Sequence, residues 1–196
     1  MSPGLILDES FWNDRYLTHQ TGWDIGNPSP PLTHFFDQLQ DKHMAILIPG
    51  CGNAYEGEYL WQLGFTNIHL LDISEILTAQ LREAWKDRET VNIITGNFFE
   101  HTGQYDLIVE QTFFCTLLPG HRSAYSAKMK ALLKPGGCLT GLLFDEVFET
   151  SPPFGGNKEE YTDVFENDFH IEKMERCYNS IKPRAGRELF FRLRQK

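Results

Sequence analysis

The sequence lacks an excess of basic residues and lacks any long apolar run. Lysine and arginine total 18 against 27 aspartate and glutamate residues, which gives a formal net charge of −9. A protein that binds a phosphate backbone needs a basic patch, so this balance argues against nucleic acid as a partner. No stretch reaches the length of a membrane span, and the amino terminus has no secretory signal. We therefore expect a cytoplasmic protein without nucleic-acid or membrane partners.

Patterns of cysteine and histidine that bind metals or form disulfide frameworks are also missing. The four cysteines are far apart, with no C-x-x-C pair, and the seven histidines have no spacing typical of metal ligands. We interpret the cysteines as reduced thiols and expect no metal. Cys51 lies between two glycines, where a small residue suits a tight turn. Since no heptad or long exposed apolar stripe requires a partner, we expect a monomer.

Length and composition indicate one globular unit. The chain has 196 residues, of which 41% are hydrophobic and 23% are charged, as in an ordinary soluble protein. This length allows one sizeable core and is too short for two full lobes. We expect a single domain over residues 1–196, with a lid and helix in residues 1–43 and the core in residues 44–196.

Residues 45–57 (AILIPGCGNAYEG) form the segment around which the chain is organised. An apolar run that ends abruptly in glycines predicts a buried parallel strand followed by a tight turn. Only glycine lets a backbone bend there and still approach a ligand closely. Residues 56–63 have a helical composition. The unit is therefore strand, glycine turn and helix, which places backbone N–H groups and a positive helix end at the edge of a sheet.

A second apolar run, residues 67–74, carries a carboxylate where its strand ends. Asp72 follows Gly50 by about 20 residues, the separation at which an acid accepts hydrogen bonds from ribose hydroxyls. The alternative is that Asp72 only caps the helix that starts near Glu75. The Gly50-x-Gly52 pattern lacks the third glycine of the dinucleotide fingerprint and is weak by itself. Turn and acid together favour a nucleoside-type ligand.

Strands and helices alternate along the rest of the chain. Further strands are predicted at residues 91–99, including an exit loop, at 105–114 and at 138–144, with helices at 32–39, 76–86 and 122–133. This alternation predicts an α/β fold with a doubly wound, mostly parallel sheet. The tail differs, because a short helix at 159–165 precedes strands near 170–178 and 188–194 with no full helix between them. That pattern predicts a closing antiparallel hairpin.

The amino-terminal residues are rich in aromatic side chains. Residues 8–19 have the pattern of an amphipathic helix. Its apolar side consists of Phe11, Trp12, Tyr16 and Leu17. The turn-rich segment 21–31 adds Trp23. These side chains either pack across the sheet edge or cover a cationic ligand as a lid.

Polar residues at two strand exits are candidate ligand contacts. Asn97 is placed to meet a base or ribose edge and Phe98 to stack on it, although turn chemistry and core packing also explain both. Glu110 and Gln111 interrupt the apolar run at the carboxyl end of the fourth strand, where open α/β sheets bind ligands. Because burying polar groups is costly, both residues need a reason to be there.

The combination of these features resembles the class I S-adenosylmethionine-dependent methyltransferases. Three segments make it similar to the thiopurine S-methyltransferase family. They are residues 12–16 with 21–24 (WNDRY, TGWD), 48–52 (IPGCG) and 110–115 (EQTFFC). Residues 183–188 (PRAGRE) are similar to the ending of its thiol, thiocyanate and halide methyltransferase branch. The resemblance covers nearly the whole chain and implies a Rossmann-like, seven-stranded sheet with an amino-terminal helical lid and a carboxyl-terminal antiparallel hairpin.

The resemblance also implies a cofactor, S-adenosylmethionine, with S-adenosylhomocysteine as its product. The implied cofactor-binding residues are Trp12, Trp23, Gly50, Gly52, Asp72, Ile73, Asn97, Phe98 and Gln111. In the family pattern the glycines pass the methionine part, Asp72 holds the ribose hydroxyls and the Asn-Phe pair holds the adenine. The two tryptophans close over the cofactor, and Gln111 lines the floor beside the sulfonium.

The reaction we expect is methyl transfer to a small soft nucleophile, with a thiol preferred. A soft thiolate or halide needs positioning and loss of water more than it needs a strong base. This fits a sequence with no recognisable His–Asp or Cys–His arrangement. Arg184 or Arg187 either favours the acceptor anion electrostatically or belongs to a solvated face. The expected apolar pocket is formed by Phe113, Phe114 and Phe154.

Three other interpretations stay open on sequence alone. A thiocyanate or halide methyltransferase is one, but that branch typically has a tyrosine after the paired prolines, where this chain has Phe154 like the thiopurine enzymes. A non-catalytic sensor that binds the cofactor is the second. A nucleotide-dependent oxidoreductase is the third, and the missing third glycine argues against it. The physiological acceptor is not determined by these patterns.

Overall fold

The computed structural model describes residues 7–149 and 152–196, and its centre is one seven-stranded sheet with the order β3-β2-β1-β4-β5-β7-β6. The strands are β1 (Ile46–Pro49), β2 (Ile68–Asp72), β3 (Val91–Thr95), β4 (Tyr105–Gln111), β5 (Leu133–Phe144), β6 (Phe169–Arg176) and β7 (Glu188–Gln195). Strands β3, β2, β1, β4 and β5 are parallel, and β7 runs antiparallel to both β5 and β6. The predicted doubly wound sheet with a closing antiparallel hairpin is confirmed.

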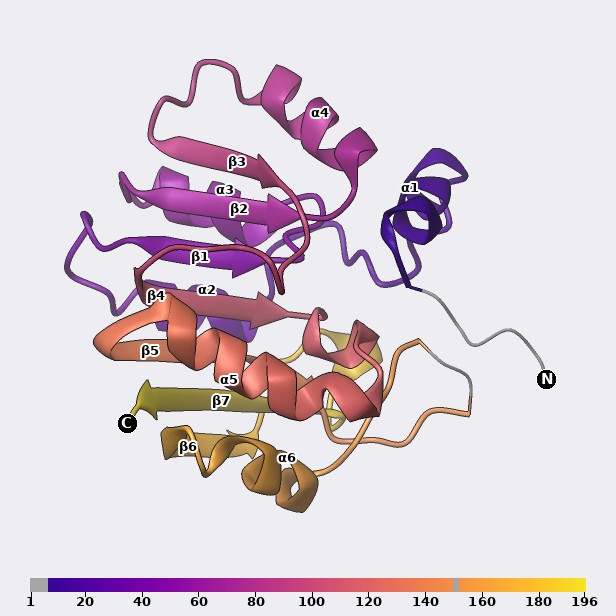
Figure 1. The fold of residues 1–196 in the computed structure, drawn as a ribbon, viewed down its shortest axis with the longest axis vertical. Coiled ribbons are helices and arrows are strands. Elements are labelled where there is room, and N and C mark those ends of the chain that lie inside the picture. The colour runs from indigo at the N-terminus through magenta and orange to yellow at the C-terminus, as the bar shows by residue number, and fades with distance from the viewer. Residues whose placement is uncertain (1–6, 150–151) are drawn as a thin grey trace.

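Helices cover both faces of this sheet. The α-helices of the described residues are α1 (Glu9–Leu17), α2 (Pro30–Phe36), α3 (Tyr55–Gln62), α4 (Glu75–Ala84), α5 (Arg122–Leu132) and α6 (Lys158–Phe165), and the 3-10 helices are η1 (Phe114–Thr116), η2 (Pro119–His121) and η3 (Lys182–Arg184). Helices α5 and α6 lie in front of the sheet in Figure 1, and α2 and α3 lie behind it. None of the described helices is both long and apolar enough to cross a membrane.

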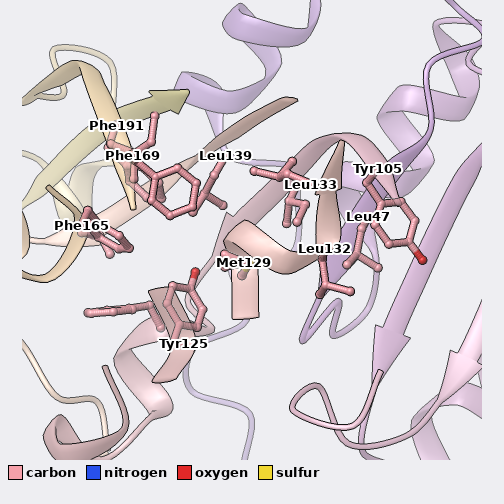
Figure 2. Close-up of a cluster of buried hydrophobic side chains, with 14 of the residues drawn as sticks. Leu47, Tyr105, Tyr125, Met129, Leu132, Leu133, Leu139, Phe165, Phe169 and Phe191 are labelled. Carbon is pink, nitrogen blue, oxygen red and sulfur yellow. The ribbon is translucent and has the colours of Figure 1, made fainter. Parts of the chain in front are cut away.

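Strand β1 shows how the sequence produces these two layers. Every residue of β1 is buried. Because side chains alternate along a strand, Ile46 and Ile48 join the core beneath α2, α3 and α4, whereas Leu47 joins the core beneath α5 and α6. Figure 2 shows this second cluster, in which Leu47, Tyr125 of α5 and Phe191 of β7 take part. A continuous apolar run is therefore the correct pattern for a strand covered on both faces.

Helix α1 lies at the carboxyl ends of the parallel strands, apart from both helical layers (Figure 1). Asn13 attaches it to the start of α4, because its Oδ1 accepts hydrogen bonds from Ser74 Oγ at 2.6 Å and from Ile76 N at 3.4 Å. The structure describes all of α1, and none of its residues is buried. The prediction that Leu17 belongs to the packed side is wrong, since this side chain is 62% exposed. The helix covers the end of the sheet, and its Tyr16 packs against the core cluster beneath α2, α3 and α4.

Two element boundaries differ from the predictions for backbone reasons. Strand β4 ends at Gln111 and not at residue 114, because Thr112 adopts a φ of +57° and the chain then turns into η1. Strand β5 begins at Leu133 and not at residue 138. Its first residue pairs with the start of β4 before a register shift, and Gly136, at a φ of +75°, lies in that irregular stretch.

Candidate active site

A cavity of about 910 Å³ lies at the carboxyl ends of the parallel strands, lined in part by residues of α1. It sits where the strand order reverses between β1 and β4, the place where open α/β sheets bind ligands. The residues selected from sequence that line it are Trp12, Trp23, Gly50, Gly52, Asp72, Ile73, Asn97, Phe98, Gln111, Phe113, Arg184 and Arg187. Side chains and backbone segments that are distant in sequence therefore share one cavity.

The two other phenylalanines expected in the pocket lie elsewhere. Phe154 does not line the large cavity, and it contributes instead to an adjoining cavity of about 290 Å³ together with Arg122. Phe114 is fully buried and packs its ring against Tyr125 of α5 and Tyr161 of α6. Of the three phenylalanines expected in the pocket, only Phe113 therefore lines the large cavity, because the turn after β4 directs the ring of Phe114 into the core and Phe154 lies at the adjoining cavity.

The turn after β1 depends on left-handed backbone conformations. Gly50 and Gly52 have φ values of +59° and +52°. A side chain at Gly50 would place its Cβ 2.4 Å from Cδ2 of Phe113, so the turn passes beneath that ring only as glycine. Between them, Cys51 is buried, and this burial raises the pKa of its thiol well above the ordinary value. Cys51 is therefore a packing residue of the turn and not a reactive thiol.

Asp72 joins the ends of β1 and β2 at the cavity. Its Oδ2 accepts a hydrogen bond from Gly52 N at 3.2 Å, and its Oδ1 accepts one from Ser74 N at 3.0 Å. The interpretation of Asp72 as a mere helix cap is wrong, because Ser74 is the N-cap of α4 and accepts from Leu77 N. Burial raises the pKa of Asp72, and its backbone hydrogen bonds oppose that shift. The carboxyl group thus serves the glycine turn and the cavity together.

The exits of β3 and β4 supply two kinds of cavity wall. Asn97 Oδ1 accepts a hydrogen bond from Phe99 N at 2.9 Å, which is the turn chemistry considered from sequence. The ring of Phe98 is 5% exposed and packs edge-on against Phe113, with centroids 5.2 Å apart. Gln111 differs, because its buried Nε2 has no hydrogen-bond partner among the described residues while its Oε1 accepts from Thr112 Oγ1. An unsatisfied donor in a cavity wall is a candidate ligand contact.

The amino-terminal segment closes the cavity with aromatic rings. Trp23 packs edge-on against Trp12 and Tyr16, with centroids 5.5 Å and 6.0 Å apart. Asp24 fastens this segment to the glycine turn, since its carboxylate accepts hydrogen bonds from Asn53 Nδ2 and from Tyr55 Oη. Sequence reasoning missed this clamp, although the TGWD segment that contains Asp24 was recognised. The signal for it was a charged residue directly after a lid tryptophan.

The two arginines have different environments. Arg184 is 8% exposed and donates to Glu188 Oε1 at 3.3 Å and to the carbonyl oxygen of Trp23 at 2.8 Å. The solvated-face interpretation is therefore wrong for Arg184, which is buried and ties β7 to the lid. It applies to Arg187, which is exposed at the cavity rim and donates to Glu146 at 2.7 Å. This pairing with Glu146 raises the pKa of Arg187.

One part of the cavity, here called the apolar end, has a largely apolar lining. It is bordered by Phe113, whose ring lies over Gly50, and its other lining residues include Cys115, Phe144, Phe148, Pro152 and Pro153. Burial raises the pKa of the Cys115 thiol, so this sulfur stays protonated and acts as an apolar contact. Within the part of the chain that the structure describes, no group of three His, Cys, Asp or Glu side chains could hold a metal ion. The cavity therefore offers a hydrogen-bonding end at the strand exits and a dry end beside them.

Comparison with known sequences identifies a family over almost the whole chain. Residues 7–194 match the sequence model of the thiopurine S-methyltransferase family. The chain is 30% identical over 162 residues to the probable thiol methyltransferase 2 of Arabidopsis thaliana, and the match covers 78% of this chain and 70% of that protein. It is 26% identical to thiocyanate methyltransferase 1 of the same plant, over 93% of this chain and 83% of the relative.

Comparison with solved structures supports the fold independently. The 1,6-didemethyltoxoflavin-N1-methyltransferase of Burkholderia thailandensis, solved with 1,6-didemethyltoxoflavin and S-adenosylhomocysteine, superposes with a TM-score of 0.79. The match covers 100% of this chain and 93% of that one at 18% identity. At this identity the likeness concerns the fold, which is the Rossmann-like methyltransferase fold expected from the sequence.

Proposed function

The chain belongs to the thiopurine S-methyltransferase family and is an S-adenosylmethionine-dependent S-methyltransferase, and from this premise we propose that it methylates a small thiol held in the apolar end of the cavity. The observation that carries this proposal is an apolar cavity wall beside two arginines whose charges are already neutralised by glutamates. Arg184 is paired with Glu188 and Arg187 with Glu146. At this end of the cavity, therefore, an inorganic anion meets no uncompensated arginine, whereas an apolar thiol substituent meets Phe113 and Phe148.

The residues around the glycine turn fit the cofactor. We assign the ribose hydroxyls to Asp72, whose carboxylate is buried at the end of β2. The methionine part belongs beside Gly50 and Gly52, and the orphaned Nε2 of Gln111 is a donor for it. The remaining proposed contacts are Ile73, the adenine-facing Asn97 and Phe98, and the covering Trp12 and Trp23. When bound, S-adenosylmethionine supplies an electrophilic methyl group on a sulfonium.

The chain's own contribution to the reaction is orientation and exclusion of water. The apolar wall strips water from the attacking sulfur, and attack by an anion on a cation disperses charge, which a dry site favours. The lid rings and the turn after β4 hold acceptor and cofactor in line, which accounts for much of the rate in such displacements. The thiolate arises from the acidity of the acceptor itself, so thiols that ionise near neutral pH are the best substrates.

We also propose that the chain works as a single-domain monomer in the cytoplasm. The sequence has no heptad pattern that requires a partner, and the exposed large hydrophobic side chains of the described residues, Leu17, Trp61, Val147 and Tyr178, come from separate segments. All four cysteines lie within the described residues and are free and buried, which supports a reducing compartment.

The test is methyl transfer to a panel of acceptors, with S-adenosylhomocysteine and the methylated product measured by mass spectrometry. We expect turnover with benzenethiol that exceeds turnover with thiocyanate and iodide. Asp72→Ala is the control and should lose most cofactor binding in calorimetric titration. Binding of the cofactor without product from any acceptor would replace this proposal with the sensor interpretation. Failure of the wild type to bind S-adenosylmethionine would refute it outright.

A further inference from the structure

Glu110 is a fully buried carboxyl group that does not line the cavity. It lies at the end of β4, where its Oε1 accepts hydrogen bonds from Phe113 N and Phe114 N, both at 2.8 Å. Its Oε2 has no hydrogen-bond partner among the described residues. Burying a carboxyl group is costly even when half of it is satisfied, so its presence requires an explanation.

Among the described residues, titratable side chains face Glu110, but none of the basic ones forms an ion pair with it. The groups that face it are Cys115 of η1, Tyr125 of α5 and Tyr161 of α6, and the pKa of each is raised in part by Glu110. Tyr125 belongs to the buried cluster of Figure 2. On the neighbouring strand Gly141 stands opposite, and a Cβ there would lie 2.9 Å from Cβ of Glu110. Because residue 141 is a glycine, the space beside β5 is free for the side chain of Glu110.

The two hydrogen bonds of Glu110 close a turn that the backbone itself disfavours. Thr112 lies between the carboxyl group and its two N–H donors and has a φ of +57°. This left-handed conformation is unfavourable for any residue with a side chain and most of all for a β-branched one. Phe113 is the N-cap residue of η1, and its own side chain makes no capping hydrogen bond. Glu110 therefore supplies the cap that keeps the turn in this conformation.

The same turn carries residues of both ends of the cavity. Gln111 lines the cavity on the proposed cofactor side. Its Nε2 has no hydrogen-bond partner among the described residues. The ring of Phe113 fills the space above Gly50, where the turn after β4 approaches the turn after β1. The carbonyl oxygen of Cys115 accepts a hydrogen bond from Phe154 N at 2.6 Å. This bond holds the segment that contains Pro152 and Pro153, which line the apolar end. A shift of this turn would move both reactants relative to each other.

We propose that Glu110 is a positioning residue for methyl transfer: by capping the turn over residues 111–114, it holds Phe113 against Gly50 and fixes the alignment of acceptor and cofactor. This inference rests on the proposed function, since it concerns the same cavity. In-line displacement is sensitive to small errors in alignment, so a loosened turn lowers kcat more than it lowers binding.

The test compares three variants with the wild type. Glu110→Gln retains an oxygen that accepts from both N–H groups and should keep kcat within about threefold. Glu110→Leu has a similar size without an acceptor and should lower kcat by about 10- to 100-fold, while the Kd for S-adenosylhomocysteine changes by less than about threefold. Adding Thr112→Gly to Glu110→Leu should recover about threefold or more of kcat, because glycine adopts a positive φ without the cap.

A purely structural role predicts a different result, namely lower melting temperatures in both Glu110 variants with unchanged kcat in the folded fraction. That result overturns the inference, and so does an equal loss of kcat in Glu110→Gln and Glu110→Leu. If the leucine variant does not fold, Glu110→Asp serves instead, since its shorter side chain cannot reach both N–H groups and must lower kcat. Absence of turnover in the wild type would refute the proposed function, whereas wild-type turnover with an unaffected Glu110→Leu refutes only this inference.

Discussion

Replacing Gly50 by alanine perturbs the point where the turn after β1 meets the turn after β4. Two costs add there. A side chain at a φ of +59° costs about 1–2 kcal/mol in the left-handed region. The new Cβ would lie 2.4 Å from Cδ2 and 3.1 Å from Cβ of Phe113, so the whole residue has to move, which costs about 1–3 kcal/mol. Together the two terms predict a loss of roughly 3 kcal/mol in the free energy of unfolding.

The assay for this prediction combines thermal unfolding with calorimetric titration. For a chain of this size each 1 kcal/mol lowers Tm by about 2–4 °C, so Gly50→Ala should lower Tm by roughly 6–12 °C. The same methyl group intrudes beside the proposed position of the methionine part and displaces Phe113 from the cavity wall. We therefore expect the Kd for S-adenosylhomocysteine to rise at least about tenfold, which corresponds to about 1.4 kcal/mol.

Gly64 provides the matched control, because it has a φ of +86°, has no atom within 4 Å of the place that an added Cβ would occupy, and does not line the cavity. Gly64→Ala should lose only the backbone term, about 1–2 kcal/mol, and should bind S-adenosylhomocysteine like the wild type. Equal Tm shifts and equal affinities for the two variants would refute the reasoning, since they would mean that the contact between Gly50 and Phe113 contributes nothing.

Three further predictions follow from burial and charge. Burial raises the pKa of Glu110 from 4.5 to about 7, so the folded protein keeps a proton that the unfolded chain releases. Wild-type stability should therefore fall by about 3 kcal/mol between about pH 4.5 and pH 7, and urea titrations of Glu110→Gln should lack this contribution. Asp72→Asn should weaken S-adenosylhomocysteine binding about 10- to 100-fold in calorimetry, because hydrogen bonds to a charged group are lost. Arg184→Met should lower the free energy of unfolding by about 3–5 kcal/mol, because it leaves buried Glu188 without its partner. Arg187→Met, at the exposed rim, should leave Tm unchanged. Equal Tm shifts in the two variants would contradict this contrast.

The features that sequence reasoning predicted correctly depend on short-range patterns. The strand at β1, its glycine turn and the carboxylate that ends β2 follow from continuous apolar runs and turn chemistry, which act over a few neighbouring residues. The order of the elements then placed Asp72 and Gly50 at one edge, since the carboxyl ends of parallel strands coincide. These same patterns predicted Leu17 on a packed face, because periodicity alone does not reveal that α1 covers a cavity instead of a core.

Other features depend on which elements become neighbours after folding. Arg184 and Arg187 are nearly adjacent in sequence and look equivalent there, but only the packing of β7 against the lid buries the first and leaves the second at the rim. The position of Phe154 outside the main cavity is likewise set by the loop that hydrogen-bonds to Cys115. No local pattern carries this information, because burial and pairing are properties of distant partners.

By itself, the sequence determined the architecture of this protein, its glycine turn and the family to which it belongs, since these follow from residue types at fixed local spacings. The tertiary structure decided the shape and electrostatics of the cavity. The ring of Phe113 above Gly50, the neutralised arginines and the capped turn at Glu110 all join segments whose contact no spacing predicts. The physical reason is that side-chain packing and charge pairing are decided by three-dimensional neighbours, whereas periodicity and turn preference are properties of the chain.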